Sequence, residues 1–264
     1  DVYKRQSLLS AAKFDQNYNS QYSYIAKVGY PMGMMYGFIY EGTYKYEDFD
    51  KVGDTYTLKR NVPYFSSESN TQPGMPKYAD LNGDGIIDDN DRTMIGNGMP
   101  KHTGGFTNNF EYKGFDLSIF FQWSYGNDVL NANRLFFENS NKTRDLNQYA
   151  SYADRWTPEN PESNIPRATD SGSNKVFSTR IIEDGSFLRL KTVSLGYTLP
   201  KQLTKKWKID NARVFVAGQN LWTCTGYSGY DPEVSIREGA LTPGLDFSAY
   251  PRAYSISFGI NLGF

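Results

Sequence analysis

The stretch that decides the fold is residues 254–264, which have the sequence YSISFGINLGF. Every second residue from Tyr254 to Phe264 is apolar, and the residues between them are serine, glycine or asparagine. Because successive side chains of a β-strand point to opposite faces, this pattern predicts a strand with one apolar and one polar face. An apolar strand that ends on an aromatic residue is typical of a barrel that closes in a bilayer, where an open sheet edge would leave backbone groups unpaired. We therefore predict an all-β protein, an antiparallel transmembrane β-barrel.

The composition supports a membrane-embedded sheet and argues against other classes. Aromatic residues make up 16% of the 264 residues, and Tyr and Trp favour membrane–water interfaces. The mean hydropathy of −0.61 and the lack of any apolar run of about 20 residues exclude membrane-spanning helices. The net charge is −1, and the only basic stretch is residues 201–208, so no nucleic-acid partner is expected.

The same alternation recurs upstream in four further segments, which are residues 104–112, 115–125, 192–199 and 212–222. Residues 115–125 have the ~9 to 11 residues that a tilted strand needs to cross a bilayer. Lys113 and Gly114 form a two-residue hairpin connection, and residues 36–46 are a weaker candidate for a sixth strand. About six strands are predicted. They would belong to a larger barrel, because the smallest outer-membrane barrels have ~8.

The connections between these strands alternate between short and long. Residues 112–115 and 199–212 are short connections, whereas residues 47–102, 126–186 and 223–252 are long. Outer-membrane barrels have short periplasmic turns and longer extracellular loops. The alternation therefore predicts long extracellular loops at one end of the barrel.

A soluble protein could share this pattern. In a secreted β-sandwich, the apolar face of each sheet packs against a second sheet. The alternative to the barrel is therefore a soluble secreted calcium-binding β-domain, such as a carbohydrate-binding module. That alternative requires protein to cover the apolar faces of residues 115–125 and 254–264.

One motif indicates metal chemistry. Residues 80–91, DLNGDGIIDDND, match the calcium loop D-x-[DN]-x-[DN]-G, with Asp91 where a glutamate usually closes the ligand shell. Ca²⁺ takes six to eight oxygen ligands, and this spacing wraps side-chain oxygens around one point. The expected ligands are Asp80, Asn82, Asp84, the backbone carbonyl of Ile86, Asp88 and Asp91. We expect structural Ca²⁺ that staples a long loop; the alternative is an acidic turn without an ion.

The sequence contains little that indicates an enzyme. His102 is the single histidine, and it lies at the entry to a predicted strand, so a Ser-His-Asp or Cys-His arrangement is not expected. No pair of carboxylates stands out for glycoside hydrolysis. Residues 1–6, DVYKRQ, match the translation of a sequencing-library adapter, so we expect the protein itself to be residues 7–264.

A series of short motifs, in order, resembles the carboxy-terminal part of SusC/RagA-type TonB-linked outer-membrane transporters. They are GYPMG at 29–33, YADLNGDG at 78–85, IGN at 95–97, GFDL at 114–117, RWTPENP at 155–161, EDGSFLRLK at 183–191, GQNL at 218–221 and GYDPE at 229–233. Each string alone is weak evidence. Their order and spacing together are specific, and they cover nearly all of the chain after residue 25.

The resemblance implies a barrel of about 22 strands that encloses a plug, in the outer membrane of a Gram-negative bacterium. It also implies import of oligosaccharides or peptides, energised by TonB and assisted by a SusD-type surface lipoprotein. The plug and the TonB-contacting segment would lie in a missing amino-terminal part. The family's metal loop maps onto the six residues named above. Its barrel-assembly signal maps onto Ser257, Gly259, Leu262 and Phe264.

Overall fold

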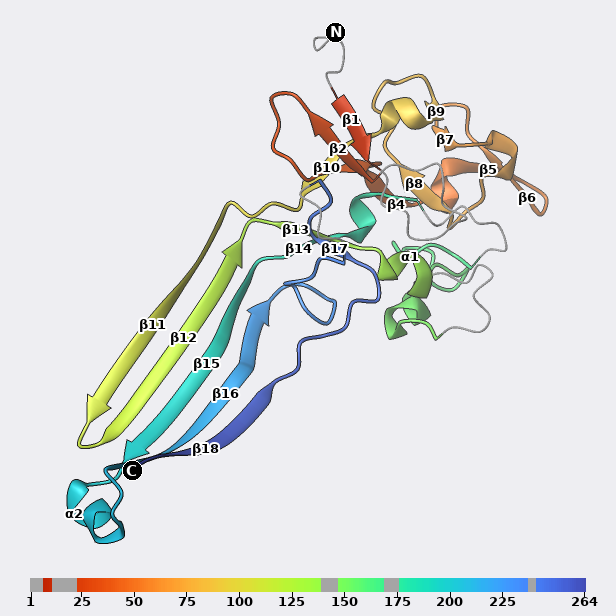
Figure 1. Cartoon of the computed structure of the whole chain (residues 1–264). Coiled ribbons are helices and arrows are strands. Elements are labelled where there is room, and N and C mark those ends of the chain that lie inside the picture. Colours follow the sequence, from red (N-terminus) through yellow and green to blue (C-terminus); the bar gives the residue numbers. More distant parts are fainter. Residues whose placement is uncertain (1–6, 11–22, 139–146, 169–175, 237–240) are drawn as a thin grey trace. The chain divides into compact units, whose positions relative to one another are not determined.

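The computed structural model describes residues 7–10, 23–138, 147–168, 176–236 and 241–264 (Figure 1). The chain divides into two compact units. Unit 1 comprises residues 1–99, 128–183 and 234–249, and unit 2 comprises residues 100–127, 184–233 and 250–264. The predicted adapter remnant, residues 1–6, lies outside the described residues. In the described part of the chain, no helix has the length and apolar character needed to span a membrane.

Unit 2 is built on one antiparallel sheet of five long strands with the order β11-β12-β15-β16-β18 (Figure 1). The strands are β11 (His102–Tyr112), β12 (Phe115–Tyr125), β15 (Phe187–Thr198), β16 (Asn211–Thr225) and β18 (Ser255–Gly263). Lys113 and Gly114 join β11 to β12 with φ angles of 48° and 85°, as expected for a type I′ hairpin turn. A short helical turn, α2 (Lys201–Thr204) and η7 (Lys205–Trp207), connects β15 to β16.

The five strands include every strongly alternating segment of the sequence. One prediction was wrong. Residues 36–46 do not form a sixth long strand, because β3 (Met34–Gly37) and β4 (Tyr40–Thr43) belong to different sheets of unit 1. Gly42 has a φ of 106° and sits at a register irregularity of the β4–β8 pair, and such a glycine interrupts a regular ladder.

Unit 1 contains most of the long segments predicted to be loops, and these segments carry strands and a core of their own. Its largest sheet has the order β1-β2-β3-β10, with β1 (Ser7–Ser10), β2 (Tyr24–Lys27) and β10 (Thr93–Asn97). Small sheets pair β4 with β8 (Pro76–Tyr78), β5 (Phe49–Val52) with β6 (Thr55–Leu58), β7 (Tyr64–Phe65) with β9 (Ile86–Ile87), and β13 (Asp128–Asn131) with β14 (Ile182–Asp184) and β17 (Leu245–Asp246). The helical elements among its described residues are α1 (Asn133–Phe137), η1 (Tyr46–Asp48), η2 (Glu68–Asn70), η3 (Asp89–Asp91), η4 (Ala150–Asp154) and η6 (Thr179–Ile181).

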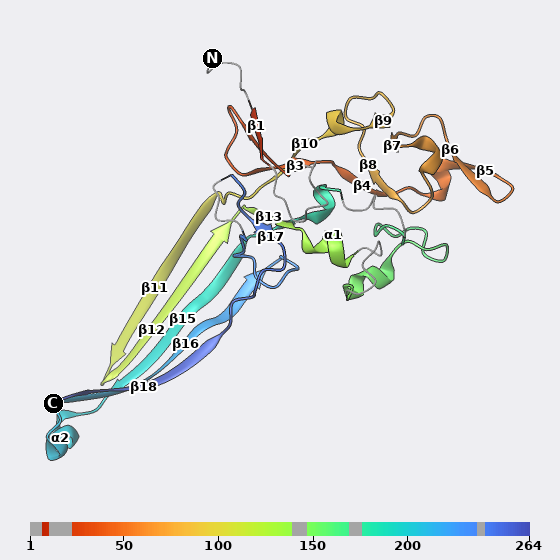
Figure 2. The ribbon, with the colours of Figure 1, turned by 45° about the vertical axis from the view of Figure 1, so that its right-hand side comes forward.

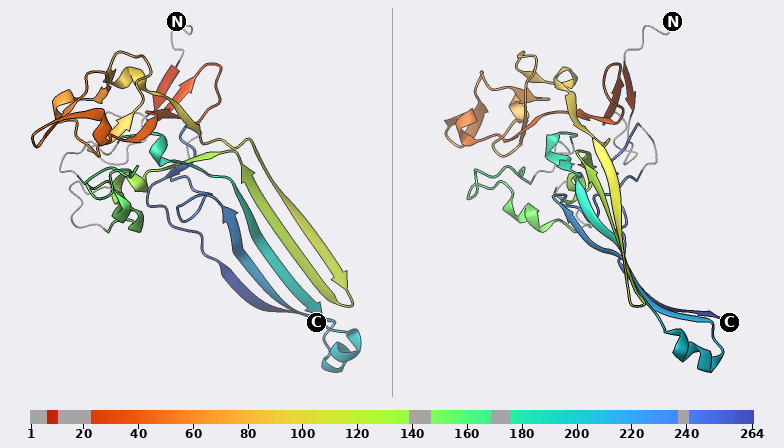
Figure 3. Two further views of the ribbon diagram at one scale, coloured as in Figure 1. Left: turned by 180° about the vertical axis from the view of Figure 1, so that it is seen from behind. Right: turned by 90° about the vertical axis from the view of Figure 1, so that its left-hand side faces the viewer.

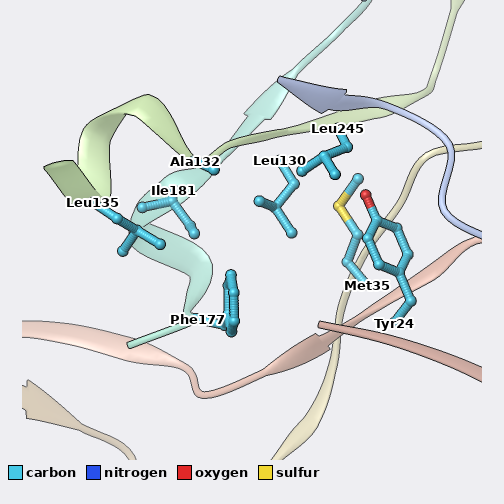
Figure 4. Packing of buried hydrophobic residues seen from close by; sticks show 8 residues of the cluster. All are labelled: Tyr24, Met35, Leu130, Ala132, Leu135, Phe177, Ile181 and Leu245. Carbon is cyan, nitrogen blue, oxygen red and sulfur yellow. The ribbon is translucent and has the colours of Figure 1, made fainter. Parts of the chain in front are cut away.

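The core of unit 1 brings together segments far apart in the sequence. Figure 4 shows Tyr24 and Met35 facing Leu130 and Leu245, with Phe177 beside them. All of these side chains are buried. Described parts of residues 128–183 and 234–249 therefore pack against β2 and β3 in one apolar cluster.

Unit 2 has almost no core of its own. Among its described residues, the buried hydrophobic side chains are Phe187, Ala212 and Tyr227. No helix or strand of unit 2 lies along either face of its sheet (Figures 2 and 3). The five strands therefore form a single layer within this unit.

Candidate membrane-facing sheet and ion-binding loop

The register of unit 2 carries one side-chain alternation across all five strands. Residues directly opposite each other on neighbouring strands share a face. One such row runs from Phe110 through Leu117, Leu195 and Val216 to Phe258. Every residue in this row is apolar, so the alternation seen along each strand is aligned across the sheet.

The face that contains this row, here called the apolar face, is large and exposed. Its apolar members are Phe106, Phe110, Tyr112, Phe115, Leu117, Ile119, Phe121, Trp123, Tyr125, Leu188, Leu190, Val193, Leu195, Tyr197, Ala212, Val214, Val216, Trp222, Ile256, Phe258, Ile260 and Leu262. The exposed fraction of Phe258 reaches 81%. An apolar surface of this extent is far larger than soluble monomers expose, and it marks a membrane or protein contact.

The opposite face, here called the polar face, has the reverse composition. Its polar members are Thr103, Thr107, Asn109, Glu111, Asp116, Ser118, Gln122, Ser124, Arg189, Thr192, Ser194, Thr198, Asn211, Arg213, Gln219, Thr223, Thr225, Ser255, Ser257 and Asn261. The large apolar exceptions are Phe120, Phe187 and Phe215. A sheet with one apolar and one polar face, and no second layer within its unit, has the side-chain arrangement of a transmembrane barrel wall.

Aromatic side chains gather at both ends of the apolar face. At one end, the Trp123 indole Nε1 donates a hydrogen bond to His102 Nδ1 at 3.1 Å, and the His102 and Tyr125 rings stack with centroids 5.1 Å apart. At the other end, the Phe115 and Tyr197 ring centroids are 4.5 Å apart. The sequence places such aromatics where interfacial belts are found in barrels.

The four predicted assembly-signal residues lie on or beside β18. Gly259 is opposite Phe215, and Leu262 is opposite Ala212. The Phe215 ring lies directly over Gly259: a Cβ there would lie 2.4 Å from Phe215 Cζ. Ser257 is on the polar face, and Phe264 follows the strand with its side chain exposed. An aromatic ring that packs over a glycine of the neighbouring strand helps to fix the register of the two strands.

A charged pair on the polar face spans three strands, near the end of the sheet where the β11–β12 turn lies. Arg213 of β16 donates through Nε to Asp116 Oδ1 of β12 at 2.9 Å, and through Nη2 to Asp116 Oδ2. The pair crosses over Gly196 of the intervening strand β15, where a Cβ would lie 2.4 Å from Arg213 Nη2. Glycine is therefore required at this position for the two side chains to meet.

Arg189 forms the centre of a second charged cluster on the polar face. Its guanidinium donates to Asp231 Oδ1 at 2.5 Å, to Glu233 Oε2 at 3.1 Å and to Thr223 Oγ1 at 3.1 Å. Its side chain is only 3% exposed, so these partners compensate a buried charge. Arg252 adds a bond to Glu233 Oε2 at 3.1 Å. The cluster holds the segment after β16 against the sheet, and it joins two of the motifs noted in the sequence.

The predicted metal loop is a compact turn in unit 1. Asp80 accepts hydrogen bonds from the backbone N–H groups of Gly83 (2.7 Å) and Gly85 (2.8 Å). Asn82 Oδ1 accepts from the Asp84 N–H at 2.9 Å, and Asp84 Oδ1 accepts from the Ile86 N–H at 2.8 Å. These bonds draw the first three expected ligands into consecutive turns of one loop. Their remaining oxygen lone pairs are the hard donors that Ca²⁺ prefers.

The carboxylates of Asp91 and Asp88 accept hydrogen bonds from other backbone N–H groups of this segment. The fully buried Asp91 carboxylate accepts from the N–H groups of Leu81 (2.8 Å), Asn82 (3.3 Å) and Asp88 (2.8 Å), so it ties the two ends of the loop together. Asp88 caps η3 by accepting from the Asn90 N–H at 2.7 Å. Across the described ranges, no three His, Cys, Asp or Glu side chains are close enough to hold a metal ion. A cation here would rely on Asn82 and backbone carbonyls besides Asp80 and Asp84.

Arg92 follows this loop and anchors it to the core. Its guanidinium carbon lies 4.9 Å from the centre of the Tyr36 ring and 5.7 Å from that of Phe38. Burial lowers the pKa of Arg92, and the nearby Asp89 carboxylate opposes that shift. Tyr64 of β7 donates its N–H to Gly85 O at 3.3 Å, which links the loop to strand β7.

Comparison with known proteins finds TonB-dependent receptors and a peptide transporter. No family model matches the chain. It is 34% identical to the TonB-dependent receptor P3 of Formosa agariphila over 247 residues, which is 91% of this chain and 23% of the receptor. It is 28% identical to the TonB-dependent receptor SusC of Bacteroides thetaiotaomicron, over 75% of this chain and 18% of SusC. A solved structure of the RagAB peptide transporter superposes with a TM-score of 0.71 and 25% identity, covering 99% of this chain and 25% of that one.

The chain belongs to the SusC/RagA-type TonB-dependent receptors. TonB-dependent receptors of this type are outer-membrane proteins of Gram-negative bacteria. The chain spans about a quarter or less of the length of the receptors it matches. The five-stranded sheet of this SusC/RagA-type chain is thus a part of a barrel fold, and it is not closed on itself.

Sequence reasoning missed the Arg189 cluster. The signal was available, because the motif at 183–191 carries Arg189 between two leucines and the motif at 229–233 carries two acidic residues. Nothing in the local pattern shows that they meet, since 42 residues separate Arg189 from Asp231.

Proposed function

We propose that the chain forms part of the barrel wall of an outer-membrane importer, with the apolar face of unit 2 against lipid and the polar face toward the lumen. The observation that carries this proposal is the aligned alternation across five strands, which leaves one exposed face apolar and the other polar. The membership in the TonB-dependent receptors supports it. TonB would supply the energy for import.

We further propose that the cargo is an oligosaccharide or a peptide and that a SusD-type surface lipoprotein is the partner. The similarity to SusC and to the RagAB peptide transporter supports this class of cargo and partner. The relatives are named as receptors or transporters, which agrees with a protein that is not an enzyme. The soluble calcium-binding domain is the less favoured function, because no second layer covers the apolar face within unit 2.

We also propose that the loop at 80–91 holds Ca²⁺ through Asp80, Asn82, Asp84 and the Ile86 carbonyl, with Asp88 contributing directly or through water. The oxygen-rich turn and its exposed side chains fit a hard cation. Asp91, expected to be a direct ligand, instead binds backbone N–H groups from both ends of the loop. When bound, Ca²⁺ would neutralise the acidic side chains and stiffen the segment.

The decisive experiment compares lysine substitutions at adjacent residues of β12 in the full-length receptor. Ile119 is on the apolar face and Ser118 is on the polar face, both near the middle of the strand. A lysine on the lipid face near the bilayer centre costs about 2–4 kcal/mol, whereas a lumen-facing lysine is tolerated. Ile119→Lys should therefore reduce the fraction of protein that migrates as a folded, heat-modifiable band, and Ser118→Lys should not.

The opposite ranking of these two variants would reject the assignment of faces. A receptor that stays in the aqueous fraction without detergent would reject the membrane location altogether. In that case the soluble calcium-binding domain would be favoured.

A further inference from the structure

The turn between β15 and β16 is rich in lysine and also exposes two large apolar side chains. Residues 199–210 contain Lys201, Lys205, Lys206 and Lys208, and their only acidic residue is Asp210. All four lysines are exposed. Among the described residues, none forms an ion pair with any of them. The turn therefore presents a concentrated positive charge to its surroundings.

Two large apolar side chains project from the same turn. Leu203 is 49% exposed and Trp207 is 64% exposed. They are four residues apart on the continuous helical segment α2–η7, so they lie on one side of it. An exposed Leu–Trp pair flanked by lysines is the composition of a segment that lies in a membrane interface, where Trp and Lys are both favoured.

The turn is ordered rather than a loose loop. Thr204 is fully buried, the Leu203 N–H donates to Pro200 O at 2.9 Å, and the Ile209 N–H donates to Thr204 O at 3.2 Å. Asp210 donates its N–H to Gly263 O of β18 at 2.8 Å. These bonds hold the lysines and Trp207 at a defined place relative to the end of the sheet.

That place is the end of the apolar face where Tyr112, Phe115 and Tyr197 lie. The Thr198 N–H donates to Gly114 O at 2.8 Å, so the β11–β12 turn and the β15–β16 turn are adjacent. Lys113 of the first turn is exposed, with its Nζ 5.1 Å from the Tyr112 ring centre. The β11–β12 turn and α2 lie at the same end of the sheet (Figure 1), so positive charge and aromatic rings are combined there.

We propose that the α2–η7 turn binds the anionic headgroups of lipids in the leaflet next to it, with Leu203 and Trp207 inserted at the interface. This inference rests on the proposed membrane position of the sheet. Each lysine near an anionic surface adds electrostatic attraction, which is screened by salt. Continuity with the apolar face makes a lipid surface the occupant, because the turn begins directly where that face ends.

The test uses the full-length receptor in vesicles of phosphatidylcholine with one-third phosphatidylglycerol. Tryptophan fluorescence is quenched by brominated phosphatidylglycerol in one sample and by brominated phosphatidylcholine in another. The difference between the wild-type protein and Trp207→Phe isolates the signal of Trp207. We expect brominated phosphatidylglycerol to quench Trp207 several-fold more strongly, and about 1 M NaCl to remove most of that preference.

The matched variants are two double substitutions. Lys205→Gln with Lys206→Gln should lower the preference several-fold. Lys27→Gln with Lys51→Gln, two exposed lysines of unit 1, should leave it unchanged. Equal quenching of Trp207 by both lipids, or a preference that survives Lys205→Gln and Lys206→Gln, would overturn the inference. Absence of quenching of any tryptophan by either lipid would instead overturn the membrane position of the sheet.

Discussion

At the scale of single residues, two glycines and one arginine organise the unit 2 sheet. Gly259 lies under the Phe215 ring, and Gly196 lies under the Asp116–Arg213 pair. In both contacts, side chains of neighbouring strands lie over the backbone of a glycine, from β16 at Gly259 and from β12 and β16 at Gly196. Arg189 differs, because its buried charge joins the sheet to a distant segment. The two glycines leave room for the side chains above them, and Arg189 donates three hydrogen bonds through one guanidinium.

Gly259→Ala should destabilise the folded receptor. The new Cβ would lie 2.4 Å from Phe215 Cζ, and overpacking of this kind costs about 1–3 kcal/mol. Gly263→Ala on the same strand is the matched control, because its Cβ would meet its nearest neighbour at 3.8 Å. Urea unfolding in detergent, followed by the folded gel band, measures both variants. Equal stability of the two would show that the Phe215 ring moves aside freely.

Arg189→Met should cost about 3–5 kcal/mol, because it leaves the Asp231 and Glu233 carboxylates without their buried partner. The amides of residues 227–233 should then exchange hydrogen faster, as mass spectrometry would detect. Arg252→Met removes a cation that is 43% exposed from the same cluster, and it should cost less than about 1 kcal/mol. A larger effect for Arg252→Met would mean that Arg189 is not the centre of the cluster.

At the scale of elements, the same chain builds two kinds of β-structure. The strands of unit 2 are 9 to 15 residues long, whereas those of unit 1 are between 2 and 5 residues long. Long strands carry the two-faced alternation. The short strands of unit 1 instead bury apolar side chains in clusters, and the 80–91 loop is attached to one of these by the β7–β9 pair.

Asp80→Ala combined with Asp84→Ala should abolish calcium-dependent protection of residues 47–102 from protease. The physical reason is that the two carboxylates supply charged ligands, and the β7–β9 pair couples the loop to the preceding segment. Asp89→Ala is the control, since Asp89 is exposed and outside the proposed ligand set. Wild-type protection that is the same with calcium and with a chelator would refute the calcium site.

At the scale of the whole molecule, the unit 2 sheet has two edges. Among the described strands, β11 pairs with β12 alone and β18 pairs with β16 alone. In lipid, unpaired backbone groups at such edges are strongly unfavourable, so a membrane sheet must close with further strands. The similarity to receptors about four times longer agrees with this requirement.

The 264-residue chain expressed alone should therefore not form a monomeric, heat-modifiable barrel in detergent. We expect aggregates on size-exclusion chromatography and a single band position on boiled and unboiled gels, because both sheet edges remain open. The full-length receptor under the same conditions should be monodisperse and should shift on heating. A monodisperse, heat-modifiable 264-residue chain would contradict the requirement for further strands.

The sequence alone was sufficient to predict the long strands, the β11–β12 hairpin and the aromatic residues at both ends of the apolar face. These features are local, since a period of two and a Lys-Gly turn depend on neighbouring residues only. The acidic loop at residues 80–91 could also be recognised from the sequence, although the bound Ca²⁺ stays a prediction. The split of residues 36–46 was not visible, because short strands are decided by the partners they find.

What the sequence by itself determined is therefore the two-faced character of each long strand, from Phe115–Tyr125 to Ser255–Gly263. What only the tertiary structure decided is which strands are neighbours, that Arg189 meets Asp231 and Glu233, and that Asp91 binds backbone at both ends of its loop. The reason is physical. Alternation is a property of the extended backbone, whereas register and buried charge pairing depend on contacts between residues far apart in the chain.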